Sequence, residues 1–167
     1  MESAHRLLIS PLACAAIWLG LSALPLATER KPLPAFTLIN SGGADVQSAE
    51  LTQDGRWLFV CIQPACEPCD TLLRTIDEAE QPRVAARMVI VVGGVDAIGL
   101  AQIAAGFPKL TTAAWYADST RSVPRLVKAP GSPFVFGLKQ QVTEWGMVGV
   151  VPDAVSAKSA LVGWAGR

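Results

Sequence analysis

The chain has 167 residues, 51% of them hydrophobic, and its 14 Lys and Arg side chains balance 14 Asp and Glu side chains to a formal net charge of zero. This neutrality gives no reason to expect nucleic acid or an anionic membrane surface as a partner. Once an N-terminal segment is set aside, the remaining length suffices for one core of ordinary size, and we find no repeat or low-complexity tract.

The first feature in chain order is an apolar run from Leu7 to Ala27 without a charged residue. Crossing a bilayer requires about 20 residues, so the run is long enough to be a signal anchor. The small residues in its last part, from Ser22 onward, equally suit a cleaved signal peptide. Basic residues flank the run on both sides and leave its orientation open. We assign residues 1–27 to this segment, 28–33 to a linker and 34–167 to one domain.

The most informative pattern is a strand that leads into a Cys-x-x-Cys pair. Trp57 to Ile62 is apolar throughout, and the segment after Cys69 has the apolar spacing of a helix. This places Cys66 at a helix N-terminus, where unpaired backbone N–H groups and the helix dipole favour a thiolate, the form that attacks disulfides. Cys69, one helical turn on, can close an internal disulfide with it.

The cysteine pair is also compatible with other kinds of site. Two cysteines at this spacing also suit a structural disulfide, half a zinc site or a reduced core. A second zinc-binding pair is missing, because the remaining cysteines are Cys61 on the strand and Cys14 in the apolar run. The single histidine, His5, argues against zinc, a Cys–His protease and a serine triad. We therefore expect no metal and no cofactor beyond a redox-active Cys66–Cys69 disulfide, and we expect Cys61 to be buried and inert.

The rest of the chain alternates between strand and helix patterns. Met88 to Val92 is a mostly β-branched apolar run that ends at two glycines, which is typical of a central parallel strand. Asp96 is suited to cap a helix that ends near Gly106. A short strand, an antiparallel hairpin and a final helix follow, at residues 113–117, 134–138 with 142–148, and 152–164. The last helix is expected to place Val155, Leu161 and Val162 against the sheet.

The order of these motifs resembles the thioredoxin-like superfamily and, within it, the membrane-anchored TlpA/ResA type of thiol-disulfide oxidoreductase. Pro34 to Leu38 looks like the opening strand of that type, Cys66-Glu67-Pro68-Cys69 like its redox tetrapeptide, and Gly131 to Phe136 like the cis-proline loop with the strand after it. The resemblance spans residues 32–164. It implies an α/β thioredoxin-like fold, with a central mixed β-sheet flanked by α-helices and preceded by one N-terminal hydrophobic helix. The chain departs from the pattern at Ala65, where members usually carry an aromatic residue.

The resemblance also implies roles for individual residues. Cys66 and Cys69 would be catalytic, Glu67 and Pro68 would tune the active site, and Ser132 with a cis Pro133 would form the substrate-binding loop. Carboxylates at positions 67 and 70 disfavour a neighbouring thiolate. A disulfide whose reduced thiolate is poorly stabilised is a weak oxidant, which predicts a reductant. The alternative role of both acids is capping of the helix N-terminus, with little effect on the potential.

The expected function is reduction of disulfides in exported proteins, and the resemblance implies candidate targets such as the haem-binding cysteines of apocytochrome c. Expected partners are protein substrates with disulfides and a membrane electron donor, but no nucleic acid. The soluble domain is expected to be a monomer in the periplasm or outside the cytoplasmic membrane, either anchored in the inner membrane or secreted after cleavage. The alternatives are a disulfide isomerase or helper in envelope assembly, and a non-catalytic thioredoxin-like binding module.

Overall fold

The computed structural model describes residues 30–51, 55–78, 82–149 and 154–166. The predicted apolar segment, residues 1–27, lies outside these ranges. Within them, no helix is long and apolar enough to cross a membrane.

One sheet organises the described part of the chain, with its strands in the order β2-β1-β5-β4-β3-β6-β7. The strands are β1 (Thr37–Asn40), β2 (Asp45–Gln47), β3 (Arg56–Ile62), β4 (Met88–Gly93), β5 (Ala114–Asp118), β6 (Phe134–Lys139) and β7 (Val142–Val148). The α-helices are α1 (Glu67–Glu78), α2 (Pro82–Ala85), α3 (Ala97–Ala105), α4 (Val123–Leu126) and α5 (Ala154–Ala165). Two short 3-10 helices complete the set, η1 (Ser48–Leu51) and η2 (Pro108–Leu110).

The sheet is mixed, as predicted. Its centre is parallel, because β3 pairs with β4 and β4 pairs with β5 in the same direction. The outer pairs β3–β6, β6–β7, β1–β5 and β1–β2 are antiparallel. All residues of β4 are buried, which explains its unbroken apolar sequence, since a central parallel strand is covered on both faces.

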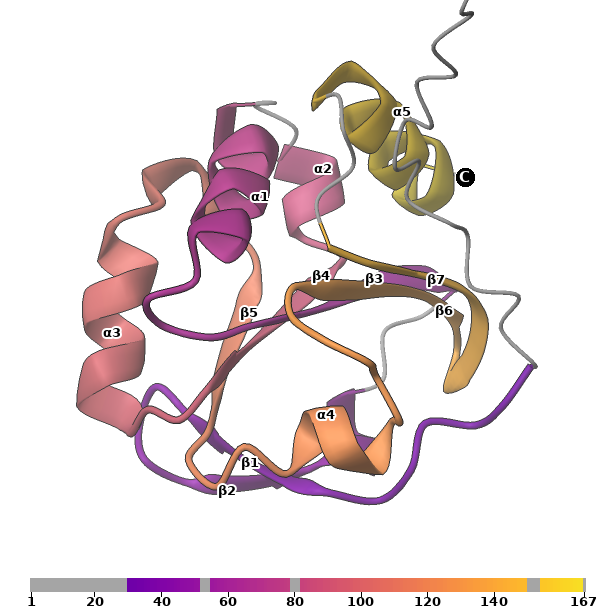
Figure 1. Cartoon of the computed structure of the whole chain (residues 1–167). Coiled ribbons are helices and arrows are strands. Elements are labelled where there is room, and N and C mark those ends of the chain that lie inside the picture. The colour runs from indigo at the N-terminus through magenta and orange to yellow at the C-terminus, as the bar shows by residue number, and fades with distance from the viewer. Residues whose placement is uncertain (1–29, 52–54, 79–81, 150–153, 167) are drawn as a thin grey trace, which may run out of the picture.

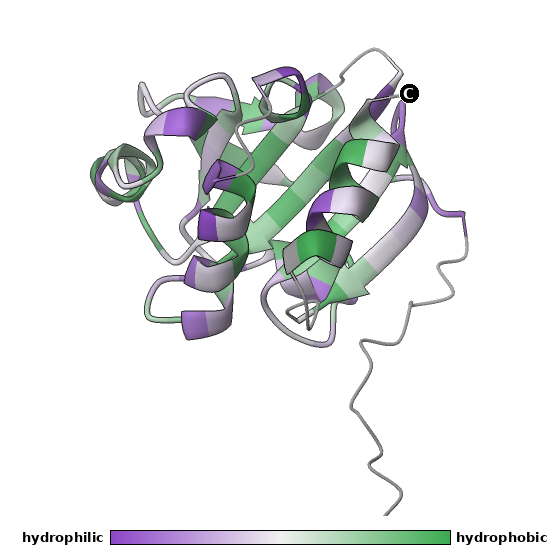
Figure 2. Ribbon diagram, turned by 90° about the horizontal axis from the view of Figure 1, so that it is seen from above, coloured by the Kyte–Doolittle hydropathy of each residue, from purple (hydrophilic) through white to green (hydrophobic). Residues whose placement is uncertain are grey.

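Alternating side chains of β3 supply two separate cores. Leu58, Val60 and Ile62 pack with residues of α1, α2 and α5 on one face of the sheet. Trp57 and Phe59 pack on the other face with residues of β1, η1 and α4. Figure 1 shows α1, α2 and α5 above the sheet and α4 below it, and Figure 2 shows the hydrophobic strands running between the helices. Because successive side chains of a strand point to opposite faces, one apolar run anchors both layers.

The expected helix after β4 is present, and its start is fixed by a side chain. The carboxylate of Asp96 accepts a hydrogen bond from the backbone N–H of Gly99 at 2.8 Å, which confirms the predicted cap. The final helix is also present, and Leu161 is buried with Val162 packed beside it. The prediction that Val155 packs against the sheet is wrong, because this side chain is 75% exposed. Val155 lies in the first turn of α5, about two turns before Val162 on the same side of the helix, so only the later part of this side packs against the core.

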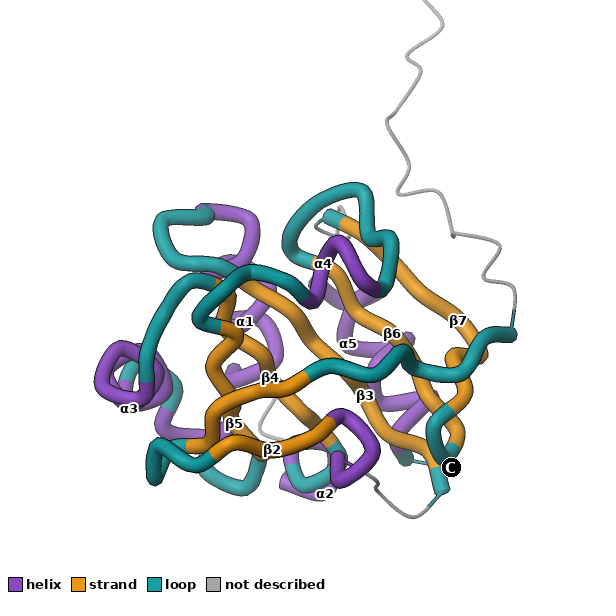
Figure 3. The backbone as a smooth tube through the Cα atoms, turned by 90° about the horizontal axis from the view of Figure 1, so that it is seen from below, coloured by secondary structure: helices purple, strands orange, loops and turns teal. Residues whose placement is uncertain are grey.

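A buried carboxylate, for which the sequence predicted no role, organises the segment between β5 and α4. Asp118 is 1% exposed and accepts hydrogen bonds from the backbone N–H groups of Ser122 and Val123, at 3.0 and 2.8 Å. The Asp118 carboxylate also accepts hydrogen bonds from the hydroxyl groups of Thr120 and Ser122. These bonds satisfy donors at the start of α4, which Figure 3 shows from below together with the loops around it.

Candidate functional site

The two cysteines lie where β3 leads into α1. β3 ends at Ile62 and α1 begins at Glu67, so Cys66 is the last residue before the helix. The Cys66 carbonyl accepts hydrogen bonds from the backbone N–H groups of Cys69 and Asp70, at 2.9 and 3.1 Å. The predicted position of Cys66 at a helix N-terminus is therefore confirmed. The preceding Ala65 has φ +54°, a left-handed conformation that turns the chain sharply into the helix.

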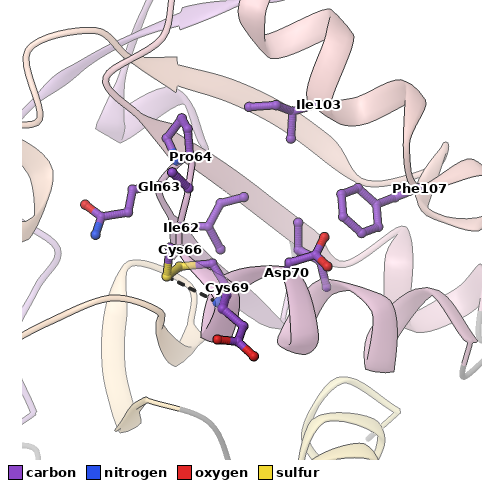
Figure 4. Close-up of a pocket in the computed structure, with 11 residues that line it drawn as sticks. Ile62, Gln63, Pro64, Cys66, Cys69, Asp70, Ile103 and Phe107 are labelled. Atoms are coloured by element: carbon purple, nitrogen blue, oxygen red, sulfur yellow. Dashed lines mark hydrogen bonds between the residues drawn. A yellow bond between two sulfur atoms is a disulfide. The ribbon is translucent and has the colours of Figure 1, made fainter.

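Cys66 and Cys69 form a disulfide, with their Cα atoms 5.2 Å apart. The two sulfur atoms differ in access, because Cys69 is only 2% exposed whereas Cys66 is half-buried at the surface. The backbone N–H of Cys69 also donates a hydrogen bond to Cys66 Sγ at 3.2 Å (Figure 4). An incoming thiolate can therefore reach Cys66, and the same N–H can stabilise negative charge on that sulfur.

The predicted proline loop lies at the end of β3 that leads to the disulfide. The Ser132–Pro133 peptide bond is cis, as the resemblance implied. β6 starts directly after this bond, and its first residue, Phe134, is paired with Cys61 near the end of β3. Pro133 is buried and Ser132 is half-buried. The register thus brings this loop and the Cys66 segment to the same edge of the sheet.

Two acidic residues lie in the first turn of α1, and their surroundings differ. Both Glu67 and Asp70 are exposed. Asp70 Oδ2 accepts a hydrogen bond from Arg74 Nε at 2.7 Å, and this bond raises the pKa of Arg74 above its ordinary value. Arg74 offsets the charge of Asp70, whereas Glu67 has no ion-pair partner among the described residues. Of the two carboxylates expected to act on Cys66, Glu67 is therefore the one whose charge is not offset.

A pocket of about 590 Å³ opens beside the disulfide, between α1 and the segment formed by α3 and η2. Both cysteines line it, and Figure 4 shows Ile103 and Phe107 facing them across it. The full lining is Ile62, Gln63, Pro64, Ala65, Cys66, Glu67, Cys69, Asp70, Leu73, Ile103 and Phe107. Neither Ile103 nor Phe107 was predicted as a site residue, because both lie more than 30 positions after the cysteine motif in the sequence.

The free cysteine of the described region, Cys61, is fully buried on the opposite face of the sheet from Cys69. Burial raises the pKa of its thiol, and the negative charge of Asp118 adds to this effect. Both causes disfavour the thiolate, which is the reactive form. The prediction that Cys61 is buried is confirmed, and its chemistry is that of a small apolar side chain.

Cys61 is expected to make folding less favourable at alkaline pH. The ordinary pKa of the thiol is 9.0, so the unfolded chain releases this proton above that pH while the folded chain retains it. Below about pH 9 the Cys61 thiol does not make the free energy of unfolding depend on pH. Above that pH the free energy of unfolding falls by about 1.4 kcal/mol per pH unit. Urea unfolding between pH 7 and 10 should show a steeper loss in the wild type than in Cys61→Ala. Parallel slopes for the two proteins would contradict the expectation.

The structure is similar to several solved disulfide-exchange proteins. No protein-family model matches the chain, and no curated protein matches it. It superposes on a Chlorobium tepidum protein assigned as a thiol:disulfide interchange protein DsbE, with a TM-score of 0.59, 20% identity, and coverage of 82% of this chain and 94% of that one.

Two further solved structures also superpose on this chain. A secreted disulfide oxidoreductase of Mycobacterium tuberculosis matches with a TM-score of 0.58 and 13% identity, over 77% of this chain and 95% of that one. A Bacteroides thetaiotaomicron protein assigned as a disulfide isomerase matches with a TM-score of 0.62 and 10% identity, over 88% and 96%. Sequence identities this low support a shared fold and not a shared function. The mixed sheet, the flanking helices and these matches together show that the chain has a thioredoxin-like fold, with the Cys66–Cys69 disulfide at the N-terminus of the helix that follows strand β3.

Proposed function

We propose that this protein is a thiol-disulfide oxidoreductase that reduces disulfides in exported proteins. The observation that carries the proposal is the asymmetry of the Cys66–Cys69 disulfide, with one sulfur accessible at a helix N-terminus and the other buried one turn later. A purely structural disulfide requires no such difference in access. Such a difference suits exchange, because one sulfur meets the substrate and the other resolves the intermediate.

The reaction follows from this arrangement. In the reduced protein, the Cys66 thiolate attacks one sulfur of a target disulfide, forming a mixed disulfide and releasing the other target sulfur as a thiolate. Cys69 then loses its proton and attacks Cys66 Sγ, which closes the internal disulfide and releases the second target thiolate. Two electrons pass from the protein to the target, and the released thiolates take up protons. A membrane electron donor returns two electrons to the Cys66–Cys69 pair.

The balance of charges around Cys66 favours a reductant. The helix N-terminus and the Cys69 N–H stabilise the thiolate, and the carboxylate of Glu67 opposes them from the adjacent position. A less stable thiolate makes the dithiol form a better electron donor. This contribution comes from Glu67, because Arg74 offsets the charge of Asp70.

The reduction potential tests this direction. We expect a value near or below that of thioredoxin, about −270 mV, when the protein is equilibrated with glutathione and dithiothreitol buffers. Glu67→Gln removes the unpaired charge and should shift the potential toward oxidising values by about 10–20 mV, as an exposed charge has a small effect. Asp70→Asn is the comparison, with a smaller shift expected. A potential near −120 mV would contradict the reductase assignment, and the absence of a reversible couple would favour a binding module.

The proposed location is outside the cytoplasmic membrane, either anchored or secreted. The apolar run from Leu7 to Ala27 supports export, and an oxidising compartment is where substrate disulfides persist. Apocytochrome c is one candidate among substrates of this kind. Mixed-disulfide trapping in cells with Cys69→Ser, followed by mass spectrometry, should recover exported proteins with disulfides. Recovery of cytoplasmic proteins alone would contradict the proposed location.

A further inference from the structure

The pocket beside the disulfide is suited to a substrate side chain. Both Cys66 and Cys69 line it, so a polypeptide held by a mixed disulfide at Cys66 has its neighbouring residues at the pocket mouth. Ile62, Leu73 and Phe107 supply apolar surface around it.

The far wall of the pocket belongs to a helix with an unusual surface. α3 carries no charged residue between Ala97 and Ala105, and of its side chains only Leu100 is buried. Ile103 is half-buried and lines the pocket, whereas Ile98 on the same helix is 70% exposed and does not line it. A charged side chain in the pocket therefore has no ionic partner on α3, and the charged residues of the lining, Glu67 and Asp70, belong to α1.

The wall is held firmly against α1. The Phe107 ring stacks on Trp115, with their centroids 6.2 Å apart, and the guanidinium of Arg74 lies over the same ring at 5.9 Å. The backbone N–H of Lys109 donates a hydrogen bond to Asp77 Oδ1 at 2.8 Å, which ties η2 to α1. The pocket is therefore preformed, so that a ligand does not have to open it.

We propose that this pocket binds an apolar side chain next to the reactive cysteine of the target polypeptide, with Ile103 and Phe107 as specificity-determining residues. The inference rests on the proposed exchange function and specifies which residues beside the target cysteine are preferred. An aliphatic or aromatic residue next to the target cysteine gains binding free energy when its side chain moves from water into the pocket. A polar residue there loses its hydrogen bonds to water. An acidic neighbour also meets the exposed carboxylate of Glu67 at the rim. The preferred targets have apolar residues beside their cysteines.

The experiment measures attack by Cys66 on matched peptides. In the full chain, the double variant Cys14→Ser with Cys69→Ser leaves Cys66 as the accessible thiol, since Cys61 is buried. Short peptides with one cysteine are activated as mixed disulfides with thionitrobenzoate and differ only in the residues beside the cysteine: leucine, serine or glutamate. Attack forms the Cys66–peptide disulfide and releases coloured thionitrobenzoate, whose appearance gives the second-order rate constant.

We expect the leucine peptide to react about tenfold faster than the serine peptide, and the glutamate peptide to be slowest. Ile103→Gln should reduce the leucine preference to about twofold or threefold without slowing the serine peptide. Ile98→Gln, on the same helix but outside the pocket, should retain the full preference. The ratio of rates within one variant is unaffected by differences in the fraction of folded protein.

Three other outcomes would overturn the inference, and they can be told apart. Equal rates for the leucine and serine peptides, with Cys66 reacting with both, would contradict the pocket assignment and leave the exchange function standing. Equal losses of preference in Ile98→Gln and Ile103→Gln would likewise contradict a role specific to the pocket wall. No reaction with any peptide would contradict both the exchange function and the inference that rests on it.

Discussion

Replacement of Cys66 by serine is expected to slow disulfide reduction by on the order of a thousandfold, because a neutral hydroxyl replaces the attacking thiolate. No other thiol of the described region can take over. Cys69 is 2% exposed, and Cys61 is fully buried on the other face of the sheet. The dithiothreitol-coupled reduction of insulin, followed by turbidity, measures this loss.

Two matched variants separate the roles of the cysteines. Cys69→Ser should retain attack but lose resolution, so that a covalent complex with the substrate accumulates and is visible on gels run without reductant. Cys61→Ala should keep its activity within about twofold, since its thiol is unreactive in the folded state. Retention of most of the activity in Cys66→Ser would contradict the exchange mechanism and leave the disulfide with a structural role.

Phe59→Ala is expected to lower the free energy of unfolding by about 3–5 kcal/mol, the usual cost of removing a buried aromatic ring. Phe59 is 0% exposed and lies in the middle of β3. Its ring contacts those of Phe36, Trp57 and Phe134, with centroid distances of 5.9, 6.3 and 6.2 Å. A cavity at this point removes contacts within β3 and with two other segments of the chain, and urea unfolding followed by tryptophan fluorescence measures the effect.

Ile98→Ala is the control for this measurement. Its side chain is 70% exposed, so the unfolding free energy should change by no more than about 0.5 kcal/mol. A loss below about 1 kcal/mol for Phe59→Ala would show that the aromatic cluster is less tightly packed than its contacts indicate. Equal losses in both variants would contradict the difference in burial on which the prediction rests.

Local patterns were sufficient to predict the central elements and the position of the cysteines. β4 was expected at residues 88–92 and extends to Gly93, and β7 has the bounds 142–148 that were expected. The helix cap at Asp96 and the placement of Cys66 before α1 also depend on neighbours within a few residues. Such features follow from side-chain periodicity and from hydrogen bonds between adjacent residues, both of which the sequence contains directly.

Features that depend on distant contacts were missed or wrong. Val155 was expected in the core because it is apolar, but it lies in the first turn of α5, and its burial depends on which turns of that helix meet the core. The role of Asp118 in fixing the start of α4 could not be read from a segment that appeared only polar and basic. The opening strand was expected from Pro34 and begins at Thr37, where pairing with β2 starts, and pairing with β5 starts at Ile39.

The amino-acid sequence by itself determined the central strand and helix pattern and the position of the cysteine pair, because apolar periodicity and the Cys-x-x-Cys spacing are local properties of the chain. Tertiary structure decided which sulfur is accessible, since the burial of Cys69 results from packing in the helix-covered core. It also brought Ile103 and Phe107 to the disulfide across a pocket. That contact joins residues far apart in sequence, and only the folding of α3 and η2 against α1 brings them together.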